Sequence, residues 1–450
     1  MDKSILKTIR FSETKQWNVE YFFATKIVSR YPISCIGEHT IHITKKVKLF
    51  EEPEREFKIL GISNEIGMFD AYSEFGKNIN QPYIFVDNGC LAYNPYRVNV
   101  GSIGLKTEKQ LNEYISPAYV VFQCKDTLIP EFLFLVLKSS VFNSLIKENT
   151  TGSVRQTLSY EKLSQIEIPV PPLSVQQDII DKFYATNKLA SNYDKKAAEL
   201  DESTNMTLFS MLGISPPAPH APIEGKLSYV KFSQCGKWSV DYLLNQHSCD
   251  FIETSKWPLV QAKKFITGCQ YGLSEKASRD SSGIPVLRMN NIQHSAIDTS
   301  DLKYLPRDTK ALDKYILKKG DLLFNRTNSK ELVGKTAVYQ LDGDHVFASY
   351  LIRVTIDPAI ANVSYVNYLF ASTIIRSQID LLSRQVLGQA NINVDELNSL
   401  RFPLPPLHEQ EKIVSIINGI KNSASMYRAK ADKHRDAAHK QFEEAVFGET

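Results

Sequence analysis

The sequence predicts an α+β protein of two tandem mixed α/β domains, each followed by a long helix, with the two helices packed against each other. The first observation behind this fold class is a short proline motif that occurs twice, as IPVPPL at residues 168–173 and as FPLPPL at residues 402–407. The second is a seam of small and apolar residues at alternating steps of four and three, which follows both copies and is typical of paired helices. Together they indicate one architectural unit used twice.

The repetition extends over the whole chain. Trp17 near the start corresponds to Trp238 in the second half, with similar residues around both. Farther on, residues 89–94 correspond to residues 320–325 at an offset of 231. From Phe132 the offset is 234 to the end of the chain, apart from a local slip near Gly152 and Gly388. A duplicated architecture commonly does one job at two sites.

Composition narrows the class of protein. With 450 residues, 43% of them hydrophobic and 23% charged, the chain has the size and balance of a soluble globular protein of two or three domains. No apolar run is long enough to span a bilayer and the polar start lacks a secretory signal, so we expect a cytoplasmic protein without membrane contact. The six cysteines form no C-x-x-C pair, which argues against a zinc ribbon or a disulfide framework. A net charge of +3 permits nucleic-acid binding without requiring it.

The chain is expected to divide into five segments. Short strand-like stretches between Gly, Asn, Asp and Pro clusters predict mixed domains at residues 1–165 and 226–399. Each domain is followed by its proline motif and long helix, at residues 166–212 and 400–450. Between the halves, residues 213–225 are rich in proline, which forbids helix and favours an extended linker.

The proline motifs are expected to lead the chain in extended conformation up to the start of each helix. In the first copy, Ser174 and Gln177 fit a capping box, so the helix is predicted to begin near Ser174. Each helix covers about 38 residues, or roughly 57 Å at 1.5 Å per residue, which is more than one small domain usually covers. The helices are therefore expected to pair, and packing of each helix on its own domain is the alternative. The core of the predicted seam consists of Ala190, Tyr193, Ala197, Leu200, Ala424, Tyr427, Ala431 and His434.

These features resemble a known family. The tandem layout, the [IF]-P-x-P-P-L-x-x-Q element before each helix, and the segment GDLLFNRTN at residues 320–328 followed by Val333-Gly334-Lys335 are similar to the specificity subunit of type I restriction-modification systems. The resemblance covers essentially the full length of the chain. It implies that the mixed domains are target recognition domains, each reading half of a split DNA site, and that the helices form an antiparallel coiled coil. It also implies the partners: double-stranded DNA, two methyltransferase subunits docked on the helices and, in a full assembly, restriction or translocase subunits.

Independent physical reasoning agrees with a bipartite target. Two similar DNA readers need a fixed spacing, and a rigid helical rod supplies it covalently. Residues 93–96 and 324–327 occupy equivalent places but differ strongly in sequence. The two half-sites are therefore expected to differ, which makes the target asymmetric.

Candidate DNA contacts follow from the chemistry of base recognition. Arginine pairs with guanine, and asparagine or glutamine with adenine, in the major groove, whereas lysine contacts phosphate. The alternative is that Gly89 and Gly320 begin strands and that the polar residues after them bond the backbone of turns. The candidates are Tyr93, Asn94, Arg97 and Asn99 in the first domain, and Arg288, Asn290, Asn291, Arg326, Asn328 and the phosphate-contacting Lys335 in the second.

The sequence predicts no catalytic residue, no metal site and no cofactor. Residues 94–96 resemble the N-P-P-[YF] element of amino-methyltransferases, but one proline is missing and the second half has no counterpart. No G-x-G-x-x-G, P-loop or nucleophile-elbow motif occurs in a suitable context. The main functional alternative is a duplicated scaffold that binds protein or RNA rather than duplex DNA. A second alternative is an enzyme with an active site in one domain.

Overall fold

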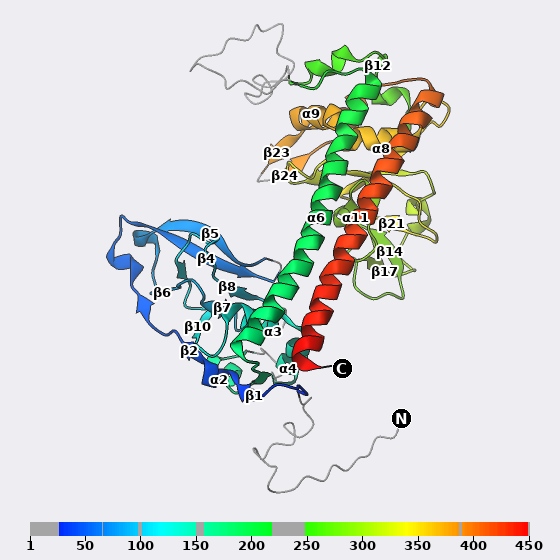
Figure 1. Ribbon diagram of the computed structural model, residues 1–450. Coiled ribbons are helices and arrows are strands. Elements are labelled where there is room, and N and C mark those ends of the chain that lie inside the picture. Colours follow the sequence, from blue (N-terminus) through cyan, green and yellow to red (C-terminus); the bar gives the residue numbers. More distant parts are fainter. Residues whose placement is uncertain are drawn as a thin grey trace. The chain divides into compact units, whose positions relative to one another are not determined.

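The computed structural model describes residues 27–64, 66–97, 101–149, 157–217, 248–386 and 389–448. The chain divides into two compact units: unit 1 combines residues 1–193 with 429–450, and unit 2 consists of residues 194–428. Two long helices, α6 (Leu173–Leu212) and α11 (Leu407–Phe447), each contribute one part to unit 1 and another to unit 2 (Figure 1). We call the rest of each unit its head.

A four-stranded antiparallel sheet forms the centre of the first head. Its strands follow in the order β2 (Thr40–His42), β10 (Val120–Cys124), β7 (Leu91–Tyr93) and β8 (Ile103–Leu105). Two helices follow these strands in the chain, α3 (Pro130–Lys138) and α4 (Ser140–Asn149). Phe122 of β10 and Phe132 of α3 are buried in one apolar cluster with Phe442 of α11, so the head and the long helices share a core.

A second sheet in the first head has five strands. Their order is β3 (Lys46–Val47), β6 (Tyr83–Phe85), β9 (Tyr114–Ile115), β4 (Glu56–Ser63) and β5 (Gly67–Phe75). The long hairpin of β4 and β5 turns at Gly67, whose φ of 72° lies in the left-handed region that glycine adopts without strain. The remaining short elements are α2 (Ile36–His39), α5 (Tyr160–Ser164), η2 (Leu49–Glu51) and η3 (Gly76–Asn78).

The second head repeats the central sheet. Its strands follow in the equivalent order β13 (Ile266–Tyr271), β22 (Leu351–Ile356), β18 (Leu322–Asn325) and β20 (Thr336–Val338), again all antiparallel. The helices α8 (Val363–Ala371) and α9 (Thr373–Leu382) take the places of α3 and α4. The predicted duplication of a mixed domain is confirmed.

The second head has two three-stranded sheets where the first has one sheet of five strands. A three-stranded sheet contains β17 (Lys303–Leu305), β14 (Ile284–Leu287) and β21 (Val346–Phe347). A second one contains β19 (Thr327–Asn328), β24 (Gln389–Asn391) and β23 (Arg384–Val386). The short elements are β15 (Ile292–Gln293), β16 (Ala296–Ile297), α10 (Val394–Ser399), η6 (Asp250–Thr254), η7 (Ala262–Lys264), η8 (Met289–Asn291) and η9 (Leu312–Tyr315).

Each proline motif forms a strand and then leads into a long helix. In unit 1, β1 (Ile33–Cys35) pairs antiparallel with β11 (Glu167–Pro169), and in unit 2, β12 (Leu259–Gln261) pairs in the same way with β25 (Arg401–Pro403). The helix α6 begins at Leu173, so Ser174 lies inside the first turn and the predicted capping box is wrong. The predicted linker at residues 213–225 lies mostly outside the described residues, and the domain boundaries stay predictions.

The [IF]-P-x-P-P-L-x-x-Q element ends in a glutamine, Gln176 or Gln410, that is buried and hydrogen-bonds the start of the helix to its head. Gln176 is 0% exposed: its Oε1 accepts from the Ile129 N–H at 2.8 Å, and its Nε2 donates to the carbonyls of Thr127 (3.1 Å) and Pro171 (2.8 Å). Gln410, also 0% exposed, accepts from the Asn362 N–H at 2.8 Å and donates to the carbonyls of Ile360 (3.2 Å) and Pro405 (2.8 Å). Both glutamines therefore join a proline segment to the residue that directly precedes α3 or α8.

Replacement of Gln410 by leucine is expected to lower the free energy of unfolding by about 2–3 kcal/mol, because a buried N–H and two carbonyls lose their partner. Urea unfolding followed by circular dichroism measures the loss, and Gln176→Leu should act similarly. The matched control is Gln177→Leu: Gln177 is exposed and bonds Asp181 of the same helix, so a change within about 0.5 kcal/mol is expected. Equal stability of the Gln410 and Gln177 variants would contradict this role.

The two long helices pack against each other in both units. In unit 1, the Phe183 and Phe442 rings lie 6.0 Å apart and Tyr193 stacks on His434 at 5.5 Å, so α11 runs opposite to α6. In unit 2, Arg428 forms an ion pair with Asp201. The antiparallel pairing predicted for the helices is confirmed.

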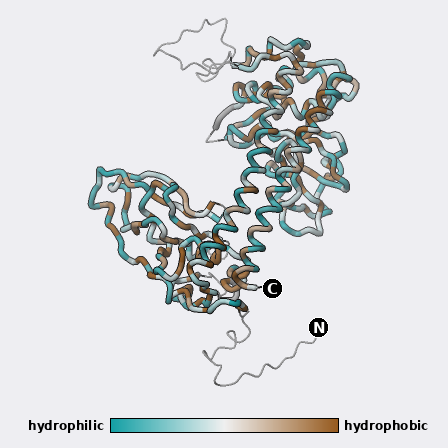
Figure 2. Tube along the Cα trace, viewed as in Figure 1, coloured by the Kyte–Doolittle hydropathy of each residue, from teal (hydrophilic) through white to brown (hydrophobic). Residues whose placement is uncertain are grey.

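Small residues occupy the contact face of this pair. Ala190 and Ala197 of α6 are each 1% exposed, whereas Leu189, next to Ala190, is 49% exposed. Ala424 and Ala431 of α11 are 0% exposed. Figure 2 shows hydrophilic residues along much of both helices with hydrophobic ones between them, as expected for rods with one narrow buried stripe. None of the described helices is both long and apolar enough to cross a membrane.

Candidate nucleic-acid interface

The ends of two strands bring Arg326 and Tyr271 together in the second head. Both β13 and β18 pair with β22, where Tyr271 lies opposite Ile352 and Asn325 lies opposite Leu351. Arg326 directly follows β18, and its guanidinium carbon lies 4.8 Å from the centroid of the Tyr271 ring. This is within the range of a cation–π contact.

A third residue completes this cluster. Asn391 is paired with Thr327 in the sheet of β19 and β24, and its Oδ1 accepts a hydrogen bond of 3.2 Å from Nη2 of Arg326. The Nε of Arg326 is buried and has no hydrogen-bond partner. We call Tyr271, Arg326 and Asn391 the arginine clamp.

The other predicted arginine of this head is engaged within the fold. Nη2 of Arg288 donates to the carboxylate of Asp301 at 2.9 Å and to its carbonyl at 2.7 Å. The hydrogen bond from Arg288 lowers the pKa of the Asp301 carboxyl. Asn291 is 2% exposed and bonds the backbone of Arg288, Asp298 and Asp301, so its burial excludes it as a base contact. Arg288 and Asn291 therefore stabilise a turn through their side-chain hydrogen bonds, which is the alternative to base contact given above.

Three further candidates lie at the surface of the second head. Asn290 is exposed, and the side chain of Gln293 links its carbonyl (3.1 Å) to Nζ of Lys335 (3.4 Å). Asn328 is half-buried in β19 and its Oδ1 accepts from the Ser329 N–H at 2.9 Å. The structure therefore brings Asn290 and Lys335 together, and it places Asn328 two residues from Arg326.

The first head presents fewer of its candidates. Tyr93 is 1% exposed in β7, its hydroxyl donates to the Leu158 carbonyl at 3.0 Å, and burial raises its pKa. Its selection as a base contact was wrong, because the side chain belongs to the core. Asn94 accepts from the Tyr96 N–H at 3.0 Å in a turn, Arg97 is exposed, and Asn99 lies outside the described residues.

The second head meets the long helices at the tip of a hairpin. His294 and Ser295, which join β15 to β16, have φ values of 51° and 63°, a strained pair for residues other than glycine. Nζ of Lys421 on α11 donates to the His294 carbonyl at 3.2 Å, and Asn367 of α8 donates to that of Ser295 at 3.0 Å. These bonds hold the strained tip in place.

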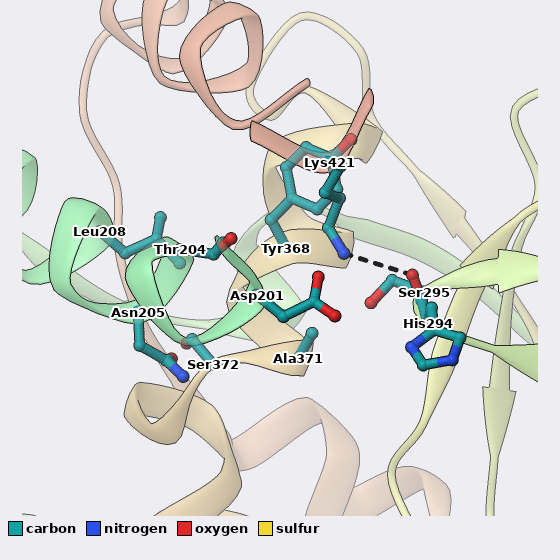
Figure 3. Close-up of a pocket in the computed structure, with 10 residues that line it drawn as sticks. All are labelled: Asp201, Thr204, Asn205, Leu208, His294, Ser295, Tyr368, Ala371, Ser372 and Lys421. Atoms are coloured by element: carbon teal, nitrogen blue, oxygen red, sulfur yellow. Dashed lines mark hydrogen bonds between the residues drawn. The ribbon is translucent and has the colours of Figure 1, made fainter. Parts of the chain in front are cut away.

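A cavity of about 200 Å³ lies beside this tip, within unit 2, and Figure 3 labels its ten lining residues. Figure 3 shows Asp201 of α6 and Lys421 of α11 on the same side of the hairpin residues, with the carboxylate of Asp201 and the Nζ of Lys421 near each other. Burial lowers the pKa of Lys421, and it also lowers the pKa of His294. Because the cavity lies between the head and its own helices, we regard it as part of their junction. The described residues contain no group of three His, Cys, Asp or Glu side chains that could hold a metal ion.

Two like heads on paired helices define a tandem two-domain protein, and comparison with known proteins gives the family. The model of the type I restriction modification DNA specificity domain matches this chain twice, at residues 57–200 and 266–428. Because the two matches together cover more than half of the sequence, one in each half, the chain belongs to this family.

Individual relatives are similar over different shares of the chain. The putative type I restriction enzyme MjaX specificity subunit of Methanocaldococcus jannaschii is 31% identical over 37% of this chain and 40% of its own. The EcoKI specificity subunit of Escherichia coli is 25% identical over 63% of this chain and 56% of its own. The chain therefore spans only about half the length of these two relatives. The MjaVIII specificity subunit of M. jannaschii is 21% identical over 95% of this chain and 94% of its own.

Among solved structures, the HsdS subunit from Thermoanaerobacter tengcongensis aligns with 93% of this chain and 96% of its own, at 15% identity and a TM-score of 0.38. At that score the likeness supports no further argument.

Proposed function

We propose that this chain is the noncatalytic DNA specificity subunit of a type I restriction-modification complex. Its two heads would be target recognition domains that read the two halves of an asymmetric split site. The paired helices would set the spacing of the heads and dock two methyltransferase subunits. Restriction or translocase subunits would join in the full assembly, which acts on double-stranded DNA in the cytoplasm.

One observation carries this proposal. The two heads share the same order of strands in their central sheets, but they carry different side chains at equivalent surface positions. Pro95 and Arg326 are equivalent, because the carbonyl of Pro95 accepts from the Leu158 N–H at 3.1 Å and that of Arg326 from the Ile392 N–H at 3.0 Å. One head thus carries proline where the other carries an arginine. Two scaffolds of the same fold with different contact residues are what a reader of two unlike half-sites requires.

The proposed contact residues are those predicted from the sequence that the structure leaves accessible. Arg326 and Asn328 provide base-reading chemistry in the second head, and Asn290 and Lys335, which Gln293 links, are its other candidates. Asn94 and Arg97 would serve the first head. The contacts of Lys335 would position the duplex without selecting a sequence.

We test the chain in complex with its methyltransferase subunits, on a duplex that carries the sequence motif methylated by this complex. Binding to this duplex is expected to weaken steeply with increasing salt. Release of counterions from roughly 6–10 phosphate contacts lowers the association constant about 10³–10⁵-fold between 50 and 200 mM salt. Fluorescence anisotropy with a labelled duplex measures this slope, and a scrambled duplex and a single-stranded RNA serve as controls.

Duplex affinity that does not depend on salt, or preferential binding of the RNA, would contradict the proposed function. Either result would favour the alternative of a scaffold that binds protein or RNA. Sequencing of DNA methylated by the complex provides the second readout, and one split motif is expected.

A further inference from the structure

We propose that the arginine clamp reads a guanine in the half-site bound by the second head, with Tyr271 and Asn391 as the residues that position Arg326. This inference rests on the proposed function and adds to it a base, a reading residue and two positioning residues. Neither Tyr271 nor Asn391 belongs to the candidates that the sequence indicated.

Arg326 differs from the other partly buried arginines of unit 2 because no carboxylate of the described residues neutralises its charge. Other partly buried arginines of unit 2 are paired with carboxylates: Arg288 with Asp301, Arg353 with Asp321 and Arg376 with Asp380. Arg326 is half-buried, and within the described part of the chain no carboxylate lies at ion-pair distance from it. Because a desolvated cation without a partner is costly, the site favours a ligand that supplies hydrogen-bond acceptors.

Tyr271 and Asn391 fix the orientation of the Arg326 guanidinium. The Tyr271 ring covers one face of it at 4.8 Å, and Asn391 takes one Nη2 hydrogen at 3.2 Å. These contacts hold the planar fork in one orientation before any ligand binds, which lowers the entropy lost on binding. Nε is buried, so the N–H groups of Nη1 and the second N–H of Nη2 are left to donate to two acceptors side by side, as O6 and N7 of guanine are arranged.

The surface around the arginine clamp is accessible to a ligand. Tyr271 is 43% exposed, and Tyr350, whose carbonyl accepts from the Arg326 N–H at 3.0 Å, is 49% exposed. Two large aromatic residues are thus partly exposed where the clamp lies, at the ends of β13 and β18. A duplex can therefore approach this part of the head.

The first head has no arginine at the position of the clamp. Pro95 occupies the place of Arg326 in the first head and has no side-chain donor. The guanine read by the clamp should therefore belong to one half-site only. Two acceptors on a phosphate would satisfy the same guanidinium, and the experiment separates these two sources.

The test uses the whole chain, coexpressed with its methyltransferase subunit in a host without other DNA methylation, and maps the methylated motif by sequencing. Arg326→Lys and Arg326→Ala are expected to lose the preference for guanine at one position of one half-site. The expected loss is roughly 5–150-fold, which corresponds to the about 1–3 kcal/mol that a bidentate pair discriminates. The other half-site should remain unchanged.

The roles of Tyr271 and Asn391 are tested by variants that remove the contact with Arg326 and, for Tyr271, by a variant that keeps it. Tyr271→Leu and Asn391→Ala are expected to weaken the same preference, whereas Tyr271→Phe keeps the ring and should retain it. Arg307→Ala removes an exposed arginine of the same head and should not change the motif. Thermal melting of each complex confirms that the variants are folded.

Two outcomes would overturn the inference. One is an unchanged motif in both Arg326 variants. The other is a uniform loss of binding to all sequences that Arg326→Lys restores, which indicates a phosphate contact. In both cases a single split motif and salt-dependent binding would still support the proposed function, so the two failures are distinguishable.

Discussion

Exchange of residues 1–165 for the corresponding segment of another family member is expected to replace one half of the methylated motif and leave the other half unchanged. The physical reason is that each head has its own sheets and apolar clusters, and the second head keeps all of its own. The spacing between the half-sites should also persist, because α6 and α11 are untouched. Sequencing of DNA methylated by the chimeric complex measures all three properties at once.

The exchange has a reciprocal control. Replacement of residues 226–399 should change the opposite half of the motif, so the two chimeras together assign each half to one head. The donor head must preserve the apolar face that packs on Phe183 and Phe442, since these rings belong to the core of unit 1. A folded, active chimera whose motif is identical to that of the parent would show that the heads do not read the DNA.

Replacement of Ala431 by glutamate is expected to cost about 3–5 kcal/mol, because it places an uncompensated charge in a fully buried position. The larger side chain also prevents close approach of the helix backbones at that point. We expect the pairing of α6 with α11 in unit 1 to be lost, together with docking of the methyltransferase subunits. Urea unfolding measures the first effect, and gel filtration of the coexpressed complex measures the second.

The helix itself offers the matched control. Ala429 lies two residues away and is exposed, so Ala429→Glu introduces the same charge without burying it and should change stability by less than about 0.5 kcal/mol. In unit 2, Ala197 is buried and Ala198 is exposed, which gives a second pair of variants. Complexes that persist with glutamate at position 431 would count against the helix pair as the docking element.

Local and periodic features of the fold could be predicted from the sequence. The proline motifs and the seam depend on residues within a few positions of one another, and each long helix begins directly after the prolines of its motif, at Leu173 and Leu407. The order of the sheets could not be predicted in the same way. Strands as short as β7 and β18, with three and four residues, carry little pattern, and their partners lie far along the chain.

The contacts of the candidate site could not be predicted from the sequence either, because they join residues far apart in the chain. Arg326 was named from its residue type, but its partners come from strands far away in sequence; Asn391 is 65 residues distant. No local signal connects them. Tyr93 was misassigned because its side chain lies in the core, where its hydroxyl bonds the Leu158 carbonyl. Asn291 was misassigned for a similar reason, since its amide organises the turn around Asp301.

Unit 1 combines two stretches that lie far apart in the sequence, whereas unit 2 is one continuous stretch. During synthesis on the ribosome, residues 194–428 emerge as a complete unit and can fold on their own. The first head must wait for Phe442 and Val446, which fill its core and are made after all of unit 2. Loss of residues 429–447 would therefore damage a head that was made before unit 2.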